Sequence, residues 1–587
     1  MTYFLVDKSK DIPGGTSIFI LTNQGSKVAE FIEASFALYV FDEKTSLYEI
    51  SIVDLAFALD NLTYFDDIKL IIPEDEQNAY EEFKLTTEPV LKPKQHQLEA
   101  VNFLINHKKM LLLDAPGLGK TYSSILAAEE LHKRGKVNHC LIICGIASLK
   151  QNWKAEIKKS SKLSCRINGE HISKFGTISY ESMEKRRQEL LNPDAPFFTI
   201  VNIESLRIPK KGTKKWNNII KELTKGPIKY DMIVFDECHK SKDSESQAAK
   251  GLLQLDAEYK IAATGTYLLN SPVDAYLGLV WLGYERKRNL SRFQSLYCVF
   301  DPNLQGQVMS YKNLDLLRYQ ISQVSLRRTI QTLKESGVET QPKYEFTKYI
   351  EMNEDQQKFY KLLSKSVKKE YKEPAKQAAD KIKLKTNNLL ALTTRLRQAT
   401  AMPGILTTQN ISSAKIDYAK ELVDQIVSQG DKVVILSTFK EPLHELYRLL
   451  EDYHPFLITG DSKEDYVARA MEDFQKNDFN KVWLGTHAKS GTGLTLNKAH
   501  YLIMIDTPWT AGLYEQSADR IYRINNDAPA VIYNLVCPGT IDNLVERLLK
   551  EKAEMSSYVL DEQNNESENI SLETFQEMDD YLNNLED

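Results

Sequence analysis

Cysteine is scarce and scattered in this chain of 587 residues, and long apolar runs are missing. The six cysteines stand at positions 140, 144, 165, 238, 298 and 537, and none of them forms a C-x-x-C pair. This usage argues against a disulfide framework or a cysteine zinc site and favours a reducing compartment. No apolar run approaches the roughly 20 residues that span a bilayer, and residues 1–8 lack the order of a signal peptide. We expect no membrane association and a location in the cytoplasm of a bacterial or phage-infected cell, or in a nucleus.

Basic residues are few at both ends of the chain, although the net charge of the whole is only −6. Residues 1–90 hold 17 acidic and 6 basic side chains, and residues 551–587 hold 12 acidic ones and a single lysine. Residues 91–550 therefore carry 68 basic and 52 acidic side chains, a net charge of +16. A basic centre fits a protein that binds a nucleic-acid backbone, but a solvated lysine-rich surface gives the same count. The acidic ends are candidate docking segments for a protein partner.

The length excludes a single hydrophobic core and favours several units. From residue 91 onward, short apolar runs alternate with amphipathic stretches, which is the pattern of parallel strands joined by helices. We expect strands at 110–113, 141–144, 198–201, 232–235 and 261–263, and again at 433–436, 482–484, 501–505 and 531–535. Between the two sets, residues 286–400 are rich in lysine and poor in glycine, which favours helices without strands.

These patterns predict an α/β fold with two parallel-sheet lobes and a helical insertion between them. Ahead of the lobes, runs at 17–20 and 36–40 predict strands and 52–62 predicts a helix, so a small α+β domain is expected there. The polar, acidic residues after about 555 predict a disordered or docking tail. The expected units are the N-terminal domain at 1–90, the first lobe at 91–285, the helical insertion at 286–412, the second lobe at 413–550 and the acidic tail at 551–587.

Residues 114–121 read D-A-P-G-L-G-K-T and lie between a predicted strand and a helix-like stretch. A glycine turn in that place aims backbone N–H groups at phosphate oxygens, so Gly117 and Gly119 are candidate nucleotide-binding residues. In such loops the lysine, here Lys120, reaches the β- and γ-phosphates, and the hydroxyl of Thr121 holds Mg²⁺. The usual pattern has a glycine where this chain has Asp114. Taken alone, the segment also fits a glycine turn beside a surface lysine.

Two adjacent carboxylates end the predicted strand at 232–235. At the carboxyl end of a strand, Asp236 is placed to hold Mg²⁺ and Glu237 to polarise the water that attacks a γ-phosphate. Solvated acids in a turn would give the same pattern in isolation. Their position downstream of Lys120, after a strand of the same apolar type, predicts an enzyme that hydrolyses a nucleoside triphosphate.

With further segments in the expected order, these motifs resemble the superfamily 2 helicase-like ATPases, and among them the Snf2 group of DNA translocases. That group has D-E-M-G-L-G-K-T in its phosphate loop, which accounts for Asp114. Residues 91–104 resemble its adenine-recognition segment, and 141–153, 236–239 and 263–272 resemble motifs Ia, II and III. Gln97 then occupies the adenine-recognition position. The resemblance covers residues 91–550 and implies two RecA-like lobes that use ATP and Mg²⁺.

The second half of the chain matches the same group. Residues 326–328, 356–360 and 395–403 resemble the connector between the lobes, 486–499 resemble motif V and 515–524 resemble motif VI. The resemblance places Gly493 at the nucleotide, Arg523 as the arginine finger with Arg520 beside it, and Gln516 as a link to motif II. The two arginines are three residues apart and share a helix face, from which they would stabilise the charge of phosphoryl transfer. A pair of surface arginines in salt bridges is the plainer alternative.

The resemblance implies DNA as the partner, bound through its backbone by groups that hold every sequence equally. The residues that stand at the motif positions for such contacts are Ser148, Lys150, Thr266, Ser437, Thr438 and Thr486. Each of them also fits a loop or capping residue. The resemblance implies duplex or forked DNA as the track.

Several departures from the Snf2 pattern leave the catalytic groups in place. They are Ala115-Pro116 in the phosphate loop, Tyr267 in motif III and Asn525-Asn526 after motif VI. These departures argue against the chromatin-remodelling branches. Motif V at 490–495 and the segment 508–512 before motif VI look closer to the distant annealing-helicase branch, whose small HARP-type module resembles residues 41–50.

The function implied is an ATP-dependent double-stranded DNA translocase that remodels DNA by fork regression, strand annealing or displacement of bound protein. Three alternatives stay open at this point. They are a strand-separating DNA or RNA helicase, the motor subunit of a larger restriction or transcription-recycling complex, and a non-catalytic binding protein.

Overall fold

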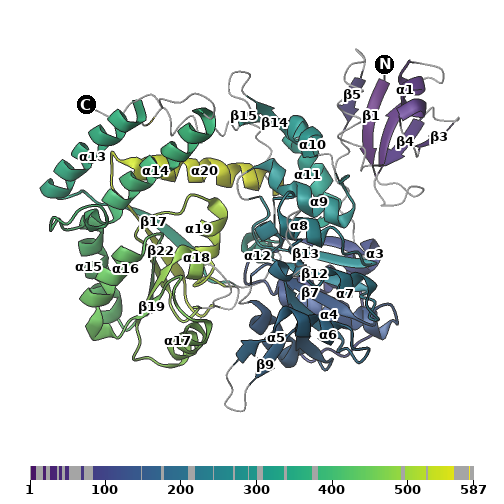
Figure 1. Cartoon of the computed structure of the whole chain (residues 1–587), viewed down its shortest axis with the longest axis horizontal. Coiled ribbons are helices and arrows are strands. Elements are labelled where there is room, and N and C mark those ends of the chain that lie inside the picture. Colours follow the sequence, from purple (N-terminus) through teal and green to yellow (C-terminus); the bar gives the residue numbers. More distant parts are fainter. Residues whose placement is uncertain are drawn as a thin grey trace.

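The structure is a computed structural model that describes residues 2–7, 17–21, 27–35, 39–42, 47–51, 68–71, 83–560 and 581. Within 83–560 it leaves out 147–148, 173–177, 209–217, 242, 269–270, 288–289, 301–307, 336–339, 373–380, 491–495 and 524–525. The described residues form an N-terminal sheet and two large parallel sheets, which belong to two lobes that lie side by side (Figure 1).

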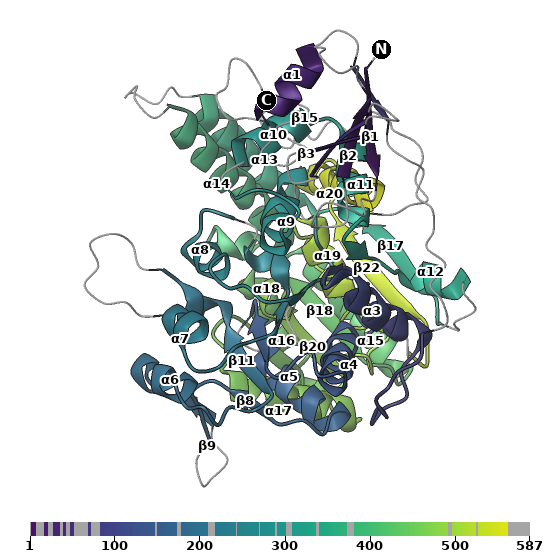
Figure 2. The ribbon, with the colours of Figure 1, turned by 90° about the vertical axis from the view of Figure 1, so that its right-hand side faces the viewer.

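The N-terminal unit is a five-stranded sheet with one helix, and it lies above the first lobe in the two views of Figures 1 and 2. Its elements are β1 (Thr2–Asp7), β2 (Ser17–Leu21), α1 (Lys27–Ser35), β3 (Tyr39–Asp42), β4 (Leu47–Ser51) and β5 (Ile68–Ile71). β2 confirms the strand expected at 17–20, and β3 begins inside the run expected at 36–40. The helix expected at 52–62 lies outside the described residues.

Lobe 1 has a seven-stranded parallel sheet with the order β16-β6-β13-β12-β7-β11-β8. The strands are β6 (Lys109–Leu112), β7 (Cys140–Cys144), β8 (Cys165–Ile167), β11 (Phe198–Asn202), β12 (Met232–Asp236), β13 (Tyr259–Ala263) and β16 (Ser325–Leu326). The helices are α3 (Gln95–His107), α4 (Lys120–Lys133), α5 (Leu149–Ser160), α6 (Met183–Leu190), α7 (Ile220–Lys225), α8 (Gln247–Leu252), α9 (Tyr276–Leu282), α10 (Leu290–Tyr297) and α11 (Leu314–Ser322). α12 (Ile330–Glu335) follows in the connector and packs on the core of lobe 2. Two hairpins, β9 (Glu170–Ile172) with β10 (Ile178–Tyr180) and β14 (Cys298–Phe300) with β15 (Val308–Tyr311), complete this part of the chain.

Lobe 2 has a six-stranded parallel sheet with the order β17-β22-β21-β18-β20-β19. The strands are β17 (Lys343–Tyr349), β18 (Val433–Ser437), β19 (Phe456–Ile458), β20 (Val482–Thr486), β21 (Tyr501–Met504) and β22 (Ala530–Val536). The helices are α13 (Glu354–Lys372), α14 (Lys381–Ala401), α15 (Ala414–Ser428), α16 (Lys440–Leu449), α17 (Glu464–Lys476), α18 (His487–Ser490), α19 (Ala511–Ala518) and α20 (Ile541–Leu560). Among the described helices, none is long and apolar enough to cross a bilayer.

The two parallel-sheet lobes confirm the predicted fold class, and the core strands form where apolar runs are continuous. β7, β12, β13, β18 and β20 are buried at every position. Strands with helices on both sides read as unbroken apolar runs because both of their faces are covered. The sequence pattern was therefore sufficient to find them.

The expectation that residues 286–400 contain no strands is wrong. β14 and β15 form a hairpin there, β16 adds to the sheet of lobe 1, and β17 adds to the sheet of lobe 2. β16 has only two residues, and in β17 the aromatic residues Tyr344 and Phe346 stay about half exposed on an edge strand. Strands this short or this exposed carry no continuous apolar run to reveal them.

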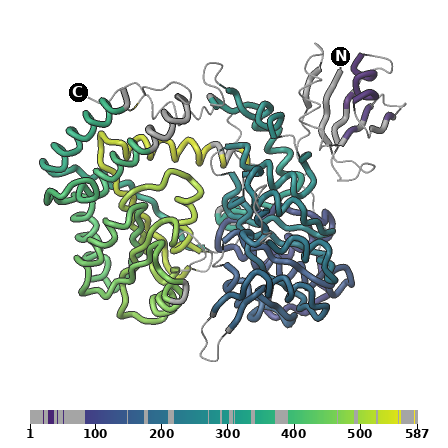
Figure 3. Tube along the Cα trace, viewed as in Figure 1, coloured from purple at the N-terminus to yellow at the C-terminus, as the bar shows by residue number. Residues whose placement is uncertain are grey.

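The last helix returns from lobe 2 to lobe 1, as the yellow segment of Figure 3 shows. α20 packs against α14 and α19 near its start and against α11 of lobe 1 further along. Val559, near its end, is buried in the core of lobe 1. Residues 551–560, assigned to the tail from their acidic composition, are thus helical, because apolar residues continue at helical spacing through Leu560.

Candidate active site

The phosphate loop joins β6 to α4, and its glycines adopt backbone angles that other residues rarely take. Gly117 and Gly119 have φ values of 82° and 86°, in the left-handed region that favours glycine. A Cβ on Gly119 would lie 2.6 Å from Nε2 of Gln97, so the close approach also requires glycine. α4 begins at Lys120, whose Nζ donates to the backbone O of Asp114 at 2.7 Å. The N-terminus of α4 and the loop together form an anion-binding end.

Gln97, expected to recognise adenine, lies in α3 beside the phosphate loop. Its Oε1 accepts from the backbone N of Lys94 at 2.9 Å, and its Nε2 lies 3.4 Å from the backbone O of Leu118. His96 donates from Nε2 to the same carbonyl at 2.8 Å. Burial lowers the pKa of His96, so the ring is neutral and its proton lies on Nε2. Two side chains of α3 therefore hold the middle of the loop.

The paired carboxylates stand at the end of β12, as predicted. Asp236 accepts from Nε1 of Trp153 at 2.7 Å, and Glu237 has a left-handed φ of 53°. Oε2 of Glu237 lies 3.2 Å from Nδ1 of His239 and 3.4 Å from the hydroxyl of Thr264. Sequence reasoning assigned no role to Trp153 or Thr264, because each reaches the site from a different strand or helix. The signal available for Trp153 was its place at the end of the segment that resembles motif Ia.

Two adjacent buried carboxylates compete for the ionised state. Burial and the charge of Glu237 raise the pKa of Asp236. Burial also acts to raise the pKa of Glu237, but the hydrogen bond from His239 and the charges of Lys120 and Arg520 outweigh it and lower that pKa. A divalent cation at Asp236 would relieve the repulsion between the two groups. Mg²⁺ usually binds proteins through one or two carboxylates and keeps water and substrate phosphates as its other ligands.

Gln516 of α19 connects the two lobes. Its Nε2 donates to Oγ1 of Thr266 at 3.0 Å and lies 3.3 Å from Nε2 of His239. With Nε2 accepting, the Nδ1–H of His239 faces Thr264 and Glu237, so the network assigns this tautomer. Thr266, expected among the DNA contacts, thus lies in the cleft with its hydroxyl bonded across the lobe interface. The link between Gln516 and motif II is present.

Both predicted arginines line the cleft from lobe 2, but α19 ends at Ala518, so they lie beyond the helix and do not share a helix face as expected. A Cβ on Gly117 would lie 3.2 Å from Cγ of Arg523, so the arginine stem packs against the loop. Arg520 is 8% exposed. Burial and the charge of Arg523 lower the pKa of Arg520 to about 10, which leaves it charged at neutral pH.

A cavity of about 430 Å³ brings these groups together. Its lining includes Gly117, Gly119, Lys120, Thr121, Trp153, Asp236, Glu237, Thr266, Gln516, Arg520 and Arg523. Gln97 is outside this lining, and Gly493 lies outside the described residues. A second cavity of about 500 Å³ shares Pro116, Gly265 and Thr266 with the first, but Lys120 and the paired carboxylates are absent from its lining. The smaller cavity is therefore the candidate nucleotide site.

The remaining predicted DNA contacts divide into two groups. Ser437 and Thr486 end β18 and β20 and are register partners, so Thr438 also stands at this edge of lobe 2. In lobe 1, Lys150 is buried, and its ammonium lies 3.5 Å from the centre of the Tyr180 ring. Ser148 lies outside the described residues.

Asp506, at the end of β21, organises the lobe-2 edge and was missed by sequence reasoning. Its carboxylate accepts from the hydroxyl of Ser437 and from the backbone N of Thr438 at 3.0 Å. Its backbone O accepts from Nε2 of His487 at 2.9 Å, and Nδ1 of that ring lies 3.1 Å from the hydroxyl of Ser517 in α19. The available signal was the same as for Asp236, a carboxylate directly after a buried strand.

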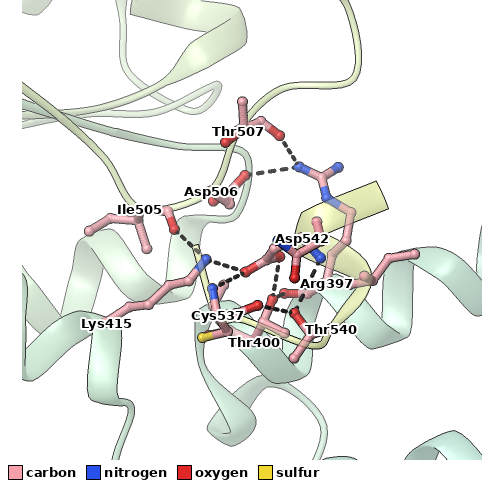
Figure 4. A network of polar contacts seen from close by, with 12 residues as sticks. Arg397, Thr400, Lys415, Ile505, Asp506, Thr507, Cys537, Thr540 and Asp542 are labelled. Carbon is pink, nitrogen blue, oxygen red and sulfur yellow. Dashed lines mark hydrogen bonds and ion pairs between the residues drawn. The ribbon is translucent and has the colours of Figure 1, made fainter. Parts of the chain in front are cut away.

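Figure 4 shows how Asp506 joins a buried network of charges. Arg397 of α14 donates from Nη2 to Asp506 at 3.3 Å and to the backbone O of Thr507 at 2.5 Å. Below them, Nζ of Lys415 lies 2.7 Å from a carboxylate oxygen of Asp542 at the start of α20. The two pairs attach α14, α15 and α20 to the carboxyl edge of the lobe-2 sheet.

The fold and the cavity define a two-lobed protein whose candidate nucleotide site lies between its lobes. A model of the SNF2-related domain matches residues 96–405, more than half of the chain, and a model of the helicase conserved C-terminal domain matches 414–525. The chain belongs to the Snf2 family of helicase-like ATPases.

Individual relatives are distant. The chain is 24% identical over 548 residues to an uncharacterized ATP-dependent helicase of Mycoplasma pneumoniae, covering 91% of this chain and 48% of that protein. It is 25% identical over 487 residues to the ISWI chromatin-remodeling complex ATPase ISW1 of Saccharomyces cerevisiae, covering 78% and 39%. The chain thus spans half or less of the length of these relatives. The Sulfolobus solfataricus SWI2/SNF2 ATPase core, solved in complex with dsDNA, is 20% identical with a TM-score of 0.37, covering 82% of this chain and 99% of that one.

Proposed function

We propose that the chain is an ATP-dependent motor that translocates on double-stranded DNA. One observation carries the proposal: a single cavity is lined by the phosphate loop of lobe 1 and by Gln516, Arg520 and Arg523 of lobe 2. A nucleotide in this cavity contacts both lobes, so binding and hydrolysis bias how the lobes are arranged. Mg²⁺ held by Thr121 and Asp236 would neutralise charge on the phosphates.

Within the site, Glu237 is placed to orient and polarise the attacking water. The donors from His239 and Thr264 fix its carboxylate and favour the ionised form. Arg520 and Arg523 supply positive charge to the phosphoryl group in flight, which is the main demand of this reaction. Because they belong to lobe 2, hydrolysis depends on the lobes being closed.

Duplex DNA is the proposed track. Residues 91–550 carry a net charge of +16, which supports a phosphate backbone as the partner. The lobe-2 edge offers the hydroxyls of the exposed Thr438 and of Thr486, groups that hold DNA without reading its sequence. The yeast relative is named as a chromatin-remodeling complex ATPase, which also supports DNA.

The finer proposal is that the motor remodels DNA by fork regression, strand annealing or displacement of bound protein, in the manner of the annealing-helicase branch. It rests on residues 490–495 of motif V, on the segment 508–512 and on the segment 41–50; of these, 491–495 and 43–46 lie outside the described residues. Two other functions have support of their own. The greater length of the relatives and the acidic ends favour a motor subunit of a larger complex. The name of the Mycoplasma relative favours a strand-separating helicase.

The test is the steady-state ATPase rate without nucleic acid and with single-stranded, duplex and forked DNA or RNA, using Lys120→Ala as the control. The proposal predicts strong stimulation by duplex or forked DNA that is lost in the control. Stimulation by single strands or RNA alone would favour the strand-separating helicase. A flat response to all of them, followed by capture of a stoichiometric partner, would favour the motor subunit.

A further inference from the structure

The connector between the lobes leaves lobe 1 directly beside the phosphate loop. β16 lies parallel to β6 at the edge of the lobe-1 sheet, and two residues after it the backbone O of Arg328 accepts from the N of Ala115 at 2.8 Å. Immediately after Arg328 the chain turns into α12. Ile330 and Leu333 of this helix pack into the core of lobe 2. Arg328 therefore stands at the junction of the two lobes.

The Arg328 guanidinium holds two parts of the nucleotide site at once. Its Nε and Nη2 donate to the two carboxylate oxygens of Asp114, each at 2.8 Å. Its Nη1 donates to Oε2 of Glu99 at 3.0 Å and to the backbone O of His96 at 2.5 Å. Asp114 is the first residue of the phosphate loop, and the other two acceptors belong to α3. A planar guanidinium suits such a two-pronged contact, whereas a lysine offers only a point charge.

This pair explains how an aspartate is tolerated where phosphate loops usually have glycine. The Asp114 side chain is fully buried and that of Arg328 is 12% exposed. A carboxylate in that position is costly unless a cation and hydrogen bonds compensate for lost water. Burial alone acts to lower the pKa of Arg328, but the charges of Asp114 and Glu99 outweigh it and raise that pKa. The arginine therefore stays charged and the pair stays intact.

Hydrogen bonds fix the connector where it passes from Arg328 into α12. The backbone N of Thr329 donates to Oγ1 of Thr332 at 2.9 Å, and the backbone N of Thr332 donates to Oγ1 of Thr329 at 3.1 Å. This reciprocal pair fixes the first turn of α12. A displacement of lobe 2 therefore reaches Arg328 through a short, hydrogen-bonded path.

We propose that Arg328 is a positioning residue that couples the orientation of lobe 2 to the phosphate loop. This proposal rests on the proposed function, because it requires that the phosphate loop binds the nucleotide. Arg328 fixes Asp114 against α3 when the lobes are closed, and movement of α12 strains this contact. Nucleotide affinity and lobe orientation are then linked through one side chain.

The test measures binding of a fluorescent, non-hydrolysable ATP analogue to the full chain, with and without duplex DNA. For Arg328→Gln we expect the analogue to bind about tenfold more weakly and to lose any response to DNA, the size of coupling usual between contacting residues. The matched control is Arg327→Gln, which changes the neighbouring arginine and should leave analogue binding unchanged. Duplex binding without nucleotide should be unchanged in both variants. Equal analogue affinity in Arg328→Gln and the unaltered chain would overturn the proposal.

A second variant separates positioning from the burial of an unpaired charge. Asp114→Asn combined with Arg328→Gln removes both charges and leaves no buried carboxylate without a partner. We expect it to unfold at the temperature of the unaltered chain and still to bind the analogue about tenfold more weakly. Recovery of full analogue affinity in the double variant would overturn the proposal. Since the readout is binding, an unaltered chain that binds the analogue but shows no DNA-stimulated hydrolysis would count against the proposed function alone.

Discussion

Trp153 is the side chain that most directly shapes the proposed Mg²⁺ ligand. Its indole N–H donates to Oδ2 of Asp236 at 2.7 Å, and its ring is 2% exposed. The hydrogen bond fixes the orientation of the carboxylate and stabilises its ionised form. A donor that holds a metal ligand in place normally changes metal affinity without touching the metal.

Trp153→Phe should therefore weaken the use of Mg²⁺. The ring volume is nearly kept, but Asp236 loses a donor, so we expect the Mg²⁺ concentration for half-maximal ATPase rate to rise about tenfold. The maximal rate at saturating Mg²⁺ should fall far less. Titrating Mg²⁺ at constant ATP measures both. An unchanged half-maximal concentration would show that the indole does not act through the ligand.

Individual functional residues could be predicted from the sequence where they stand next to one another in a motif. Lys120 and Glu237 are predictable because loop and strand geometry fix what an adjacent residue faces. Thr264 and Asp506 are not, because their partners are distant in the chain and the contacts exist only after folding. Arg328 stood in a recognised segment, but only the structure shows that it pairs with Asp114.

Among the elements, α14, α15 and α20 depend on buried charge rather than on apolar packing alone. Lys415 is fully buried at the start of α15, donates to the backbone O of Ile505 and pairs with Asp542. Asp542 also accepts from the backbone N of Cys537 and from the hydroxyl of Thr400. Removing one partner leaves the other as an uncompensated buried charge.

Lys415→Met should accordingly destabilise the chain by about 3–5 kcal/mol in denaturant unfolding. The matched control on the same helix is Lys420→Met, which breaks an exposed pair with Asp424 and should change stability little. Equal stability of the two variants would mean that the Lys415 pair contributes nothing beyond a surface pair.

The elements themselves were predictable to different degrees for a physical reason. β7 and β18 are covered on both faces, so their apolar runs are unbroken. β17 lies at an edge with exposed aromatic residues, and β16 has two residues, so neither carries such a run. α20 continues past the expected start of the tail because Val559 is buried in the core of lobe 1. The acidic composition of this segment does not reveal that contact.

In the described part of the chain, the lobes meet at the connector at Arg328, in the cleft contact of Gln516, where Arg523 packs against the phosphate loop, and where α20 returns to lobe 1. The Gln516 contact joins side chains of both lobes by hydrogen bonds. It links the lobe-2 helix α19 to His239, which holds Glu237. Lobe closure and the catalytic carboxylate are therefore connected.

Gln516→Ala should uncouple the lobes without emptying the site. We expect the DNA-stimulated ATPase rate to fall about tenfold, since a mispositioned group costs of this order, while affinity for an ATP analogue changes little. Parallel rate and binding measurements distinguish the two effects. A variant with unchanged stimulated rate would show that this contact is not used during turnover.

Displacement of a third strand from a DNA triplex is the sharpest measurement of an ATP-driven motor on duplex DNA. The substrate is a duplex in which a triplex segment is flanked by plain duplex on which the motor can start. We expect ATP-dependent displacement of the third strand, with Glu237→Gln and Lys120→Ala inactive and the two strands of the duplex still paired. A chain that hydrolyses ATP and separates the strands of a fork, but does not displace the third strand, would instead be an unwinding helicase.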